Sequence, residues 1–180
     1  MAERFTLGVI SITFLLGLAV LYGAYRTNGT DSDLSPSLSS ADSFNIIFRY
    51  GVGAKNELNT LKGTYTKDMV NKPPITTKLQ LTQEELDSIY LKALEIDLFN
   101  YPWTIHTMPK GDIIGMITPY STYYLEAWNG TTKNAVVWND KYDTENEKYF
   151  DIKELVRLII EIILSHPEYQ KLPEPTAGYA

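Results

Sequence analysis

The sequence contains no cysteine. Disulfides, thiolate nucleophiles, zinc sites with cysteine ligands and iron–sulfur clusters are therefore excluded. Histidine is scarce as well, with two residues in the whole chain, and neither belongs to a recognisable metalloprotease motif. The sequence also lacks the nucleophile elbow of serine hydrolases and the glycine-rich loop that cradles phosphates. These absences remove most of the common catalytic arrangements.

Clustered positive charge is missing too. The chain has 16 lysine and arginine residues against 22 aspartate and glutamate residues, which gives a formal net charge of −6 at pH 7. A nucleic-acid-binding surface needs clustered positive charge to neutralise phosphates. We therefore expect no nucleic-acid partner, and the lack of any cofactor-binding motif leads us to expect no cofactor.

One long uncharged run is present near the N-terminus, between Arg4 and Arg26. As a helix its 21 residues would span about 31 Å, close to the thickness of the hydrocarbon core of a bilayer. Glycines inside the run are tolerated in membrane helices. The pattern predicts that residues 1–26 form an uncleaved transmembrane anchor, with the lipid bilayer contacting residues 5–25.

Two other interpretations of this run stay open. Gly17 and Ala19 are small residues two positions apart and could mark the cleavage site of a secretion signal. A buried soluble helix is the remaining possibility. The lysine and arginine residues that flank the run are nearly balanced. Because a four-residue head is easily retained, we expect the N-terminus to be cytoplasmic and the C-terminal domain to lie outside the cytoplasm.

The rest of the chain divides into a linker and one domain. Residues 27–43 are rich in serine, aspartate, threonine and glycine, which predicts a flexible linker. Residues 44–180 are enough for one ordinary globular domain.

Strands are predicted before the first helix of this domain. Residues 44–50 alternate so that every second side chain is apolar, which indicates a strand with one buried face. A polar strand over residues 63–69 follows, with an alternative start before the bend at residues 61–63, and another strand covers residues 75–81. Thr82 and Glu85 then match the capping-box pattern, which predicts the start of a helix.

A hairpin is predicted where Asn129-Gly130 lies between two strand-like runs, because this dipeptide favours a two-residue turn. With these residues in the turn, Glu126 would lie directly opposite Lys133, a favourable cross-strand pair of charges.

The last predicted helix starts at a second capping box, formed by Asp151 and Glu154, and ends at His166-Pro167. The resulting order is β-β-β-α-β-β-α. It favours an α+β domain, in which an antiparallel sheet of about five strands carries two helices packed on one face.

Aromatic residues are the feature that most suggests binding. The chain has 13 tyrosines and 3 tryptophans, and several of them cluster around the predicted hairpin. Aromatic side chains on both faces of a strand cannot all enter one core. Core packing explains part of the set, and a recognition surface for a protein, peptide or glycan is the alternative. The candidates for this surface are Trp103, Tyr124 and Trp128.

A metal-assisted hydrolase is the competing hypothesis. His106 lies in an aromatic segment bounded by prolines, and oxygen ligands could come from Asp112, Asp140, Asp143 and Glu145. The spacing of the loop carboxylates is not that of an EF-hand. A structural histidine and a solvated acidic loop are the simpler interpretations of the same residues.

Two stretches of the chain resemble a known group of proteins. They are YGVGAKNELNTLKGTYTKDMV, followed by ITTKLQLTQEELDSIY and FNYP, and the closing HPEYQKLPEP-x-x-GY. Together they resemble a family of uncharacterised small prokaryotic proteins, anchored by a membrane span or a lipid, over about residues 44–179. The resemblance implies an extracytoplasmic α+β domain on a tether and supplies no activity. Where many such proteins would carry a lipidated cysteine, this chain has an intact apolar run.

These observations predict a single-pass protein of the cell membrane that acts by binding rather than by chemistry. Its extracytoplasmic domain would be a binding or accessory module for an unknown partner in the cell envelope. A structural subunit of a membrane complex is a further hypothesis, since Gly8 and Gly17 would allow close helix packing within the span.

Overall fold

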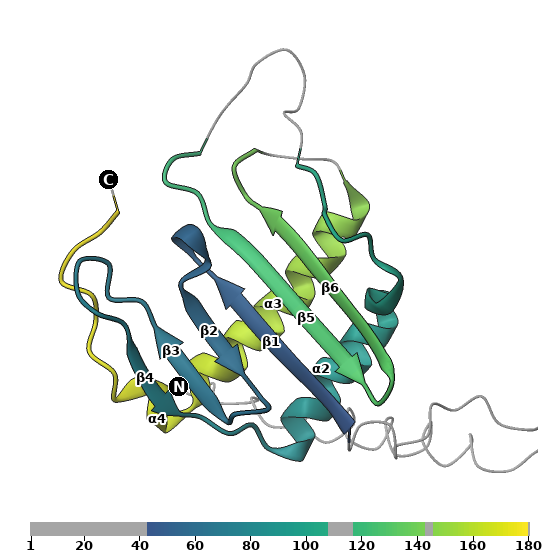
Figure 1. Cartoon of the computed structure of the whole chain (residues 1–180), viewed down its shortest axis with the longest axis horizontal. Helices are drawn as coiled ribbons and strands as arrows, with labels where there is room; N and C mark the ends of the chain where they lie inside the picture. The colour runs from purple at the N-terminus through teal and green to yellow at the C-terminus, as the bar shows by residue number, and fades with distance from the viewer. Residues whose placement is uncertain (1–42, 108–116, 143–145, 180) are drawn as a thin grey trace, which may run out of the picture. The chain divides into compact units, whose positions relative to one another are not determined.

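The computed structural model describes residues 43–107, 117–142 and 146–179 (Figure 1). These residues form a six-stranded antiparallel sheet in the order β4-β3-β2-β1-β5-β6, with helices α2 and α3 behind it in the view of Figure 1. The predicted α+β class with an antiparallel sheet is therefore confirmed, with six strands rather than about five. The predicted anchor lies outside the described residues, as does all of the linker except Ser43. Among the helices that are described, none has both the length and the hydrophobicity to cross a bilayer.

The elements follow a simple order along the chain. The strands are β1 (Phe44–Tyr50), β2 (Asn56–Asn59), β3 (Thr64–Lys67), β4 (Ile75–Lys78), β5 (Thr122–Asn129) and β6 (Thr132–Asn139). The α-helices are α2 (Gln83–Glu95), α3 (Glu147–Ser165) and α4 (Pro167–Gln170). Two short 3₁₀ helices, η2 (Val52–Ala54) and η3 (Leu98–Asn100), join them.

Strand β2 is the strand that the sequence pattern did not identify as separate, although the sequence also allows an earlier start of the polar strand. After β1 the chain reverses through η2, where Gly51 and Gly53 have φ angles of 92° and 68°, which favour glycine. Strand β2 then returns antiparallel to β1 and places Leu58 opposite Phe48. Leu58 is its one hydrophobic residue among four, so β2 lacks the alternation that marks a longer strand.

The core lies between the sheet and the two long helices. The predicted alternation of β1 is confirmed, because Phe44, Ile46 and Phe48 are buried in the hydrophobic core. The residues that meet them from the other elements include Leu125, Val136, Trp138, Ile89, Ile152, Leu155 and Ile159. Burial of side chains of this size stabilises the fold by about 1.5–3 kcal/mol each.

The capping box of α2 is also confirmed. The backbone N–H of Glu85 donates to Thr82 Oγ1 at 3.2 Å, and the backbone N–H of Thr82 donates to a carboxylate oxygen of Glu85 at 2.8 Å. Two helix-end donors are thereby satisfied.

The predicted start of α3 is wrong. The helix begins at Glu147, four residues before the capping box proposed at Asp151. Tyr149 and Ile152 are both buried, whereas Phe150, expected to pack beside the cap, is 49% exposed. Burial of Tyr149 against the core accounts for the extra turn, because tertiary packing outweighs a local capping pattern. The predicted end at His166-Pro167 is confirmed.

The predicted register of the β5–β6 hairpin is wrong by two residues. Gly130 and Thr131 form the turn, and Asn129 pairs with Thr132 at its base. Of the two turn residues only Gly130 has a positive φ, 58°, which fits a type II′ turn rather than type I′. Asn129 stays in β5 because its side chain accepts a hydrogen bond from Ser43 Oγ at 2.9 Å and donates one to the Tyr90 hydroxyl at 2.8 Å.

A shift of two residues keeps every side chain on its predicted face, because side chains alternate with a period of two. Glu126 therefore lies opposite Ala135 rather than Lys133, but Lys133 is on the same face. The predicted ion pair between Glu126 and Lys133 still forms, now diagonally across the two strands.

Candidate functional site

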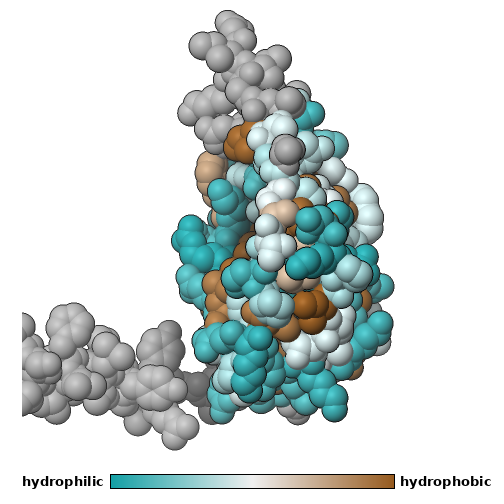
Figure 2. All heavy atoms as spheres, turned by 90° about the vertical axis from the view of Figure 1, so that its left-hand side faces the viewer, coloured by the Kyte–Doolittle hydropathy of each residue, from teal (hydrophilic) through white to brown (hydrophobic). Residues whose placement is uncertain are grey.

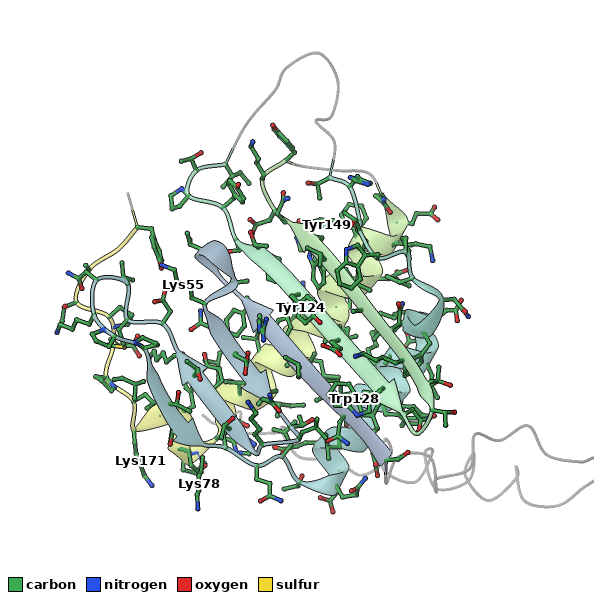
Figure 3. All side chains as sticks on the ribbon, viewed as in Figure 1. Lys55, Lys78, Tyr124, Trp128, Tyr149 and Lys171 are labelled. Atoms are coloured by element: carbon green, nitrogen blue, oxygen red, sulfur yellow. The ribbon has the colours of Figure 1, made fainter. Side chains whose placement is uncertain are left out.

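The candidate site is the face of the sheet that points away from α2 and α3, which we call the open face. Along β5, Leu125 and Ala127 are buried toward the helices, so Tyr124, Glu126 and Trp128 point the other way. Figure 3 labels Tyr124 and Trp128 along this strand. No described helix packs on the open face (Figure 1). The alternation of β5 thus separates its core residues from its candidate binding residues.

Trp103 reaches the open face by a different route. The backbone N–H of Ile105 donates to the Val137 carbonyl at 3.0 Å, and the N–H of Val137 donates to the Trp103 carbonyl at 2.8 Å. The segment therefore lies along the outer edge of β6, where Thr104 makes a parallel bridge to Val137. Ile105 is buried, while Trp103 is 60% exposed. This pairing covers part of the free edge of β6, and the indole lies against the ring of Tyr124.

The structure brings two of the three predicted residues into contact. The rings of Trp103 and Tyr124 meet edge to face, with centroids 6.3 Å apart. The guanidinium of Arg49 lies 5.4 Å from the centre of the Tyr124 ring, and the Tyr124 hydroxyl donates to Glu126 Oε2 at 2.5 Å. Burial and this hydrogen bond raise the pKa of Tyr124 to about 12. Tyr124 is therefore a neutral, fixed aromatic group at neutral pH.

Four charged side chains close to the aromatic groups of the open face are paired with one another. Arg49 Nε lies 2.6 Å from Glu57 Oε2, and Lys133 pairs with Glu126. Hydrogen bonds from Lys133 and from the Tyr124 hydroxyl hold the pKa of Glu126 below its usual value. Because these charges are satisfied within the face, a partner need not supply counter-charges to bind the aromatic groups between them.

A groove surrounds Trp128, the third predicted residue. Its volume is about 430 Å³, and it is lined by Trp128 with Ile47, Leu61, Glu126, Gly130, Thr131 and Lys133. Leu61 is 60% exposed. Tyr124 and Trp128 are four residues apart on one strand, so their Cα atoms are about 13 Å apart. The open face therefore presents two aromatic positions, one at Tyr124 with Trp103 and one at the groove.

The residues proposed for a metal site are not brought together in the described parts of the chain. His106 is exposed, and the carboxylate of Asp140 accepts hydrogen bonds from the Ser121 backbone N–H at 2.6 Å and the Tyr123 hydroxyl at 3.3 Å. Within the described residues no three His, Asp or Glu side chains are placed to hold a metal ion. The remaining candidates, Asp112, Asp143 and Glu145, lie outside the described residues.

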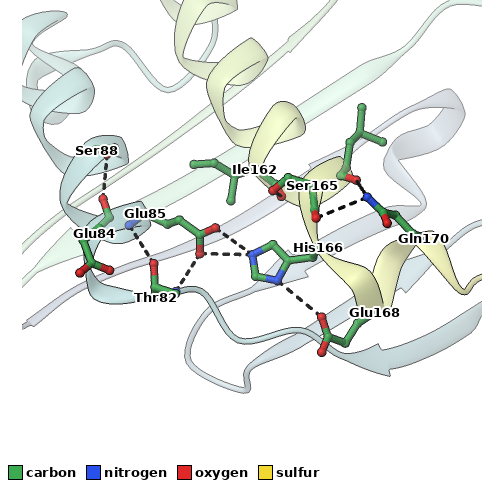
Figure 4. Close-up of polar contacts among 10 residues, drawn as sticks. Thr82, Glu84, Glu85, Ser88, Ile162, Ser165, His166, Glu168 and Gln170 are labelled. Atoms are coloured by element: carbon green, nitrogen blue, oxygen red, sulfur yellow. Dashed lines mark hydrogen bonds and ion pairs between the residues drawn. The ribbon is translucent and has the colours of Figure 1, made fainter.

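His166, the other histidine, joins two helices (Figure 4). Its Nε2 lies 3.1 Å and 3.2 Å from the two carboxylate oxygens of Glu85, and its Nδ1 lies 3.7 Å from Glu168. Glu85 also completes the capping box of α2, so one carboxylate fixes the start of α2 and the end of α3. This arrangement is a structural link, and it lies away from the open face.

The C-terminal segment, residues 167–179, packs along the β3–β4 side of the domain. Lys67 Nζ lies 2.9 Å from Glu174 Oε1 and 4.8 Å from the centre of the Tyr169 ring. The Tyr179 hydroxyl donates to Asp68 Oδ2 at 2.5 Å. Figure 2, which views this side, shows a mainly hydrophilic surface with small, separated hydrophobic patches. We therefore assign the segment a stabilising role rather than a binding role.

Comparison with known proteins does not assign the chain to a family. No family model matches it, and no curated protein is similar enough to count as a match. The resemblance to anchored prokaryotic proteins therefore stays a prediction.

Proposed function

We propose that the chain is a non-catalytic binding module that recognises a protein partner in the cell envelope through the open face of its sheet. The observation that carries the proposal is the placement of Trp103, Tyr124 and Trp128 on this one face, while the helices cover the other. Aromatic residues dominate the energetics of protein interfaces, together with arginine.

The arrangement of the face suits a protein partner. Trp103 and Tyr124 are held by a backbone bridge, a ring contact and a hydrogen bond, so binding them costs little side-chain entropy. Paired charges surround the aromatic groups, which matches the polar rim and aromatic centre of typical interfaces. The groove at Trp128 would accept an apolar side chain of the partner.

The predicted N-terminal anchor would hold this module at the cell membrane. We propose that residues 1–26 span the cell membrane, with the N-terminus in the cytoplasm and the domain outside. A flexible linker of 17 residues would reach roughly 20–25 Å. Tethering would raise the effective concentration of the open face for a partner in the same membrane or close to it.

The topology is tested by treating intact and lysed cells with protease and measuring the mass of the chain in the membrane fraction. The proposal predicts a full-length mass before digestion and loss of the domain in intact cells. Protection of the domain until lysis would contradict the proposed location, and a shortened mass would show a cleaved signal instead of an anchor.

The binding surface is tested by co-purification of partners with the full-length protein from native membranes. We expect Trp128→Ala and Tyr124→Ala to lose a partner that the Leu91→Ala variant retains. Leu91 is a matched control, because it is an exposed hydrophobic residue, 60% exposed, on α2. Retention of every partner by both open-face variants would contradict the proposal.

A further inference from the structure

A second cavity lies on the opposite side of the sheet from the open face. It has a volume of about 420 Å³ and lies between α3 and the paired strands β5 and β6. Its lining includes the aromatic residues Tyr123, Trp138 and Tyr149 and the aliphatic residues Val156 and Ile160. This volume and this mainly apolar lining are those of a small-molecule site, which typically measures about 300–1,000 Å³.

The aromatic part of this cleft is rigid. Tyr123 and Trp138 are directly opposite in the β5–β6 register, and their rings stack with centroids 5.1 Å apart and an angle of 9°. Trp138 and Tyr149 are almost fully buried. The Tyr123 hydroxyl donates to Asp140, and burial raises the pKa of Tyr123 to about 12, helped by this carboxylate. A flat ligand would therefore meet preformed walls.

Two cations come from one side of α3. Lys153 and Arg157 both line the cleft, and their spacing of four residues places them on the same helix face. The Lys153 ammonium lies 5.1 Å from the centre of the Tyr149 ring. Arg157 pairs with Glu154 at 3.0 Å, but both side chains are largely exposed, so this pair is weak and can be exchanged for a ligand.

Two carboxylates also line the cleft, and they differ in their hydrogen bonding and exposure. Asp140 accepts hydrogen bonds from Ser121 and Tyr123, so its charge is partly satisfied inside the protein. Glu161 is exposed at the cleft, one helical turn beyond Arg157. Its charge would oppose an anionic ligand that Lys153 and Arg157 attract.

We propose that this cleft binds a small aromatic anion, with the ring system against the aromatic and aliphatic walls and a carboxylate at Lys153 and Arg157. The site is separate from the open face, and the proposal does not depend on the function of that face. Lys153 and Arg157 supply the preference for a carboxylate against the opposing charge of Glu161, because the walls alone would accept a neutral ring equally well.

The test measures the binding of naphthalene-2-carboxylate and its uncharged isostere, naphthalene-2-carboxamide, to the full-length protein in nanodiscs. Isothermal titration calorimetry gives both affinities, with empty nanodiscs as the blank. We expect the carboxylate to bind more tightly than the carboxamide. An equal affinity for the two probes, or no binding of either at millimolar concentration, would overturn the proposal.

Removing a cation from the cleft and removing the Glu161 carboxylate should change carboxylate affinity in opposite directions. Lys153→Gln and Arg157→Gln should each weaken carboxylate binding by about two- to fivefold, the range expected for partly exposed charges. Glu161→Gln should strengthen it by a similar factor. All three should leave carboxamide binding unchanged, as should the control Lys171→Gln, which lies far from Tyr149 of the cleft (Figure 3). Carboxylate affinities that do not follow these directions would overturn the proposal.

Discussion

The pair formed by Lys67 and Glu174 allows a sharp test of how the C-terminal segment stabilises the domain. The Lys67 side chain is 5% exposed, whereas the Glu174 side chain is 81% exposed. Breaking a fully buried pair costs about 3–5 kcal/mol, and an exposed pair contributes about 0–1 kcal/mol. Because one partner is buried and the other is not, we expect Glu174→Gln to lower the free energy of unfolding by about 1–2 kcal/mol, between these limits.

The reverse substitution should behave differently. Lys67→Met removes the buried ammonium and leaves Glu174 in water, where it needs no partner. Replacing a buried charge with an apolar group of similar size is often neutral or stabilising, so we expect a smaller cost than for Glu174→Gln. Adding Glu174→Gln to Lys67→Met should then have almost no further effect, which gives a coupling energy of about 1–2 kcal/mol in a double-mutant cycle.

Urea unfolding of the full-length variants, followed by tryptophan fluorescence, measures these differences. The slope of the free energy against urea should stay constant, because the surface exposed on unfolding is unchanged. A cost below about 0.5 kcal/mol for Glu174→Gln, or additivity of the two substitutions within about 0.3–0.5 kcal/mol, would show that this pair does not stabilise the domain.

The cap of α2, the buried tyrosines and the metal content of the protein give three other predictions. Thr82→Ala should lower the free energy of unfolding by about 1 kcal/mol, measured by urea unfolding, because it removes the side chain that caps α2. Burial raises the pKa values of Tyr50, Tyr101, Tyr123 and Tyr124 from 10.0 to about 12. These tyrosines therefore stabilise the fold fully below pH 10 and lose that contribution as the pH rises to about 12. A titration followed by phenolate absorbance should show that their ionisation coincides with alkaline unfolding. Ionisation of all tyrosines near pH 10 in the folded state would contradict this prediction. Elemental analysis of the purified full-length protein should find no stoichiometric metal, and a bound metal lost on His106→Ala would favour the hydrolase hypothesis instead.

The parts of the fold that depend on local patterns could be predicted from the sequence. Alternation identified β1. The predicted charge pair between Glu126 and Lys133 also formed despite the wrong hairpin register, because a shift of two residues keeps side chains on the same face. The capping box at Thr82 was recognisable because its two residues are three positions apart. Patterns of this length need no knowledge of the tertiary fold.

The remaining features depend on contacts between distant residues. Asn129 stays in β5 through hydrogen bonds to Ser43 and Tyr90, which no local pattern indicates. The link between Glu85 and His166 joins residues 81 positions apart. Trp103 meets Tyr124 only because its segment pairs with the edge of β6. Sequence reasoning could nominate these aromatic residues, but it could not show that two of them touch.

Photo-crosslinking from position 128 shows whether the open face contacts a protein partner. Benzoylphenylalanine would replace Trp128 in the full-length protein in native membranes, and Leu91 on α2 would be replaced in a matched control. We predict that position 128 crosslinks to one defined partner protein and that position 91 does not. Equal adducts from both positions, or an adduct from position 91 alone, would contradict the assignment of the open face as the binding surface.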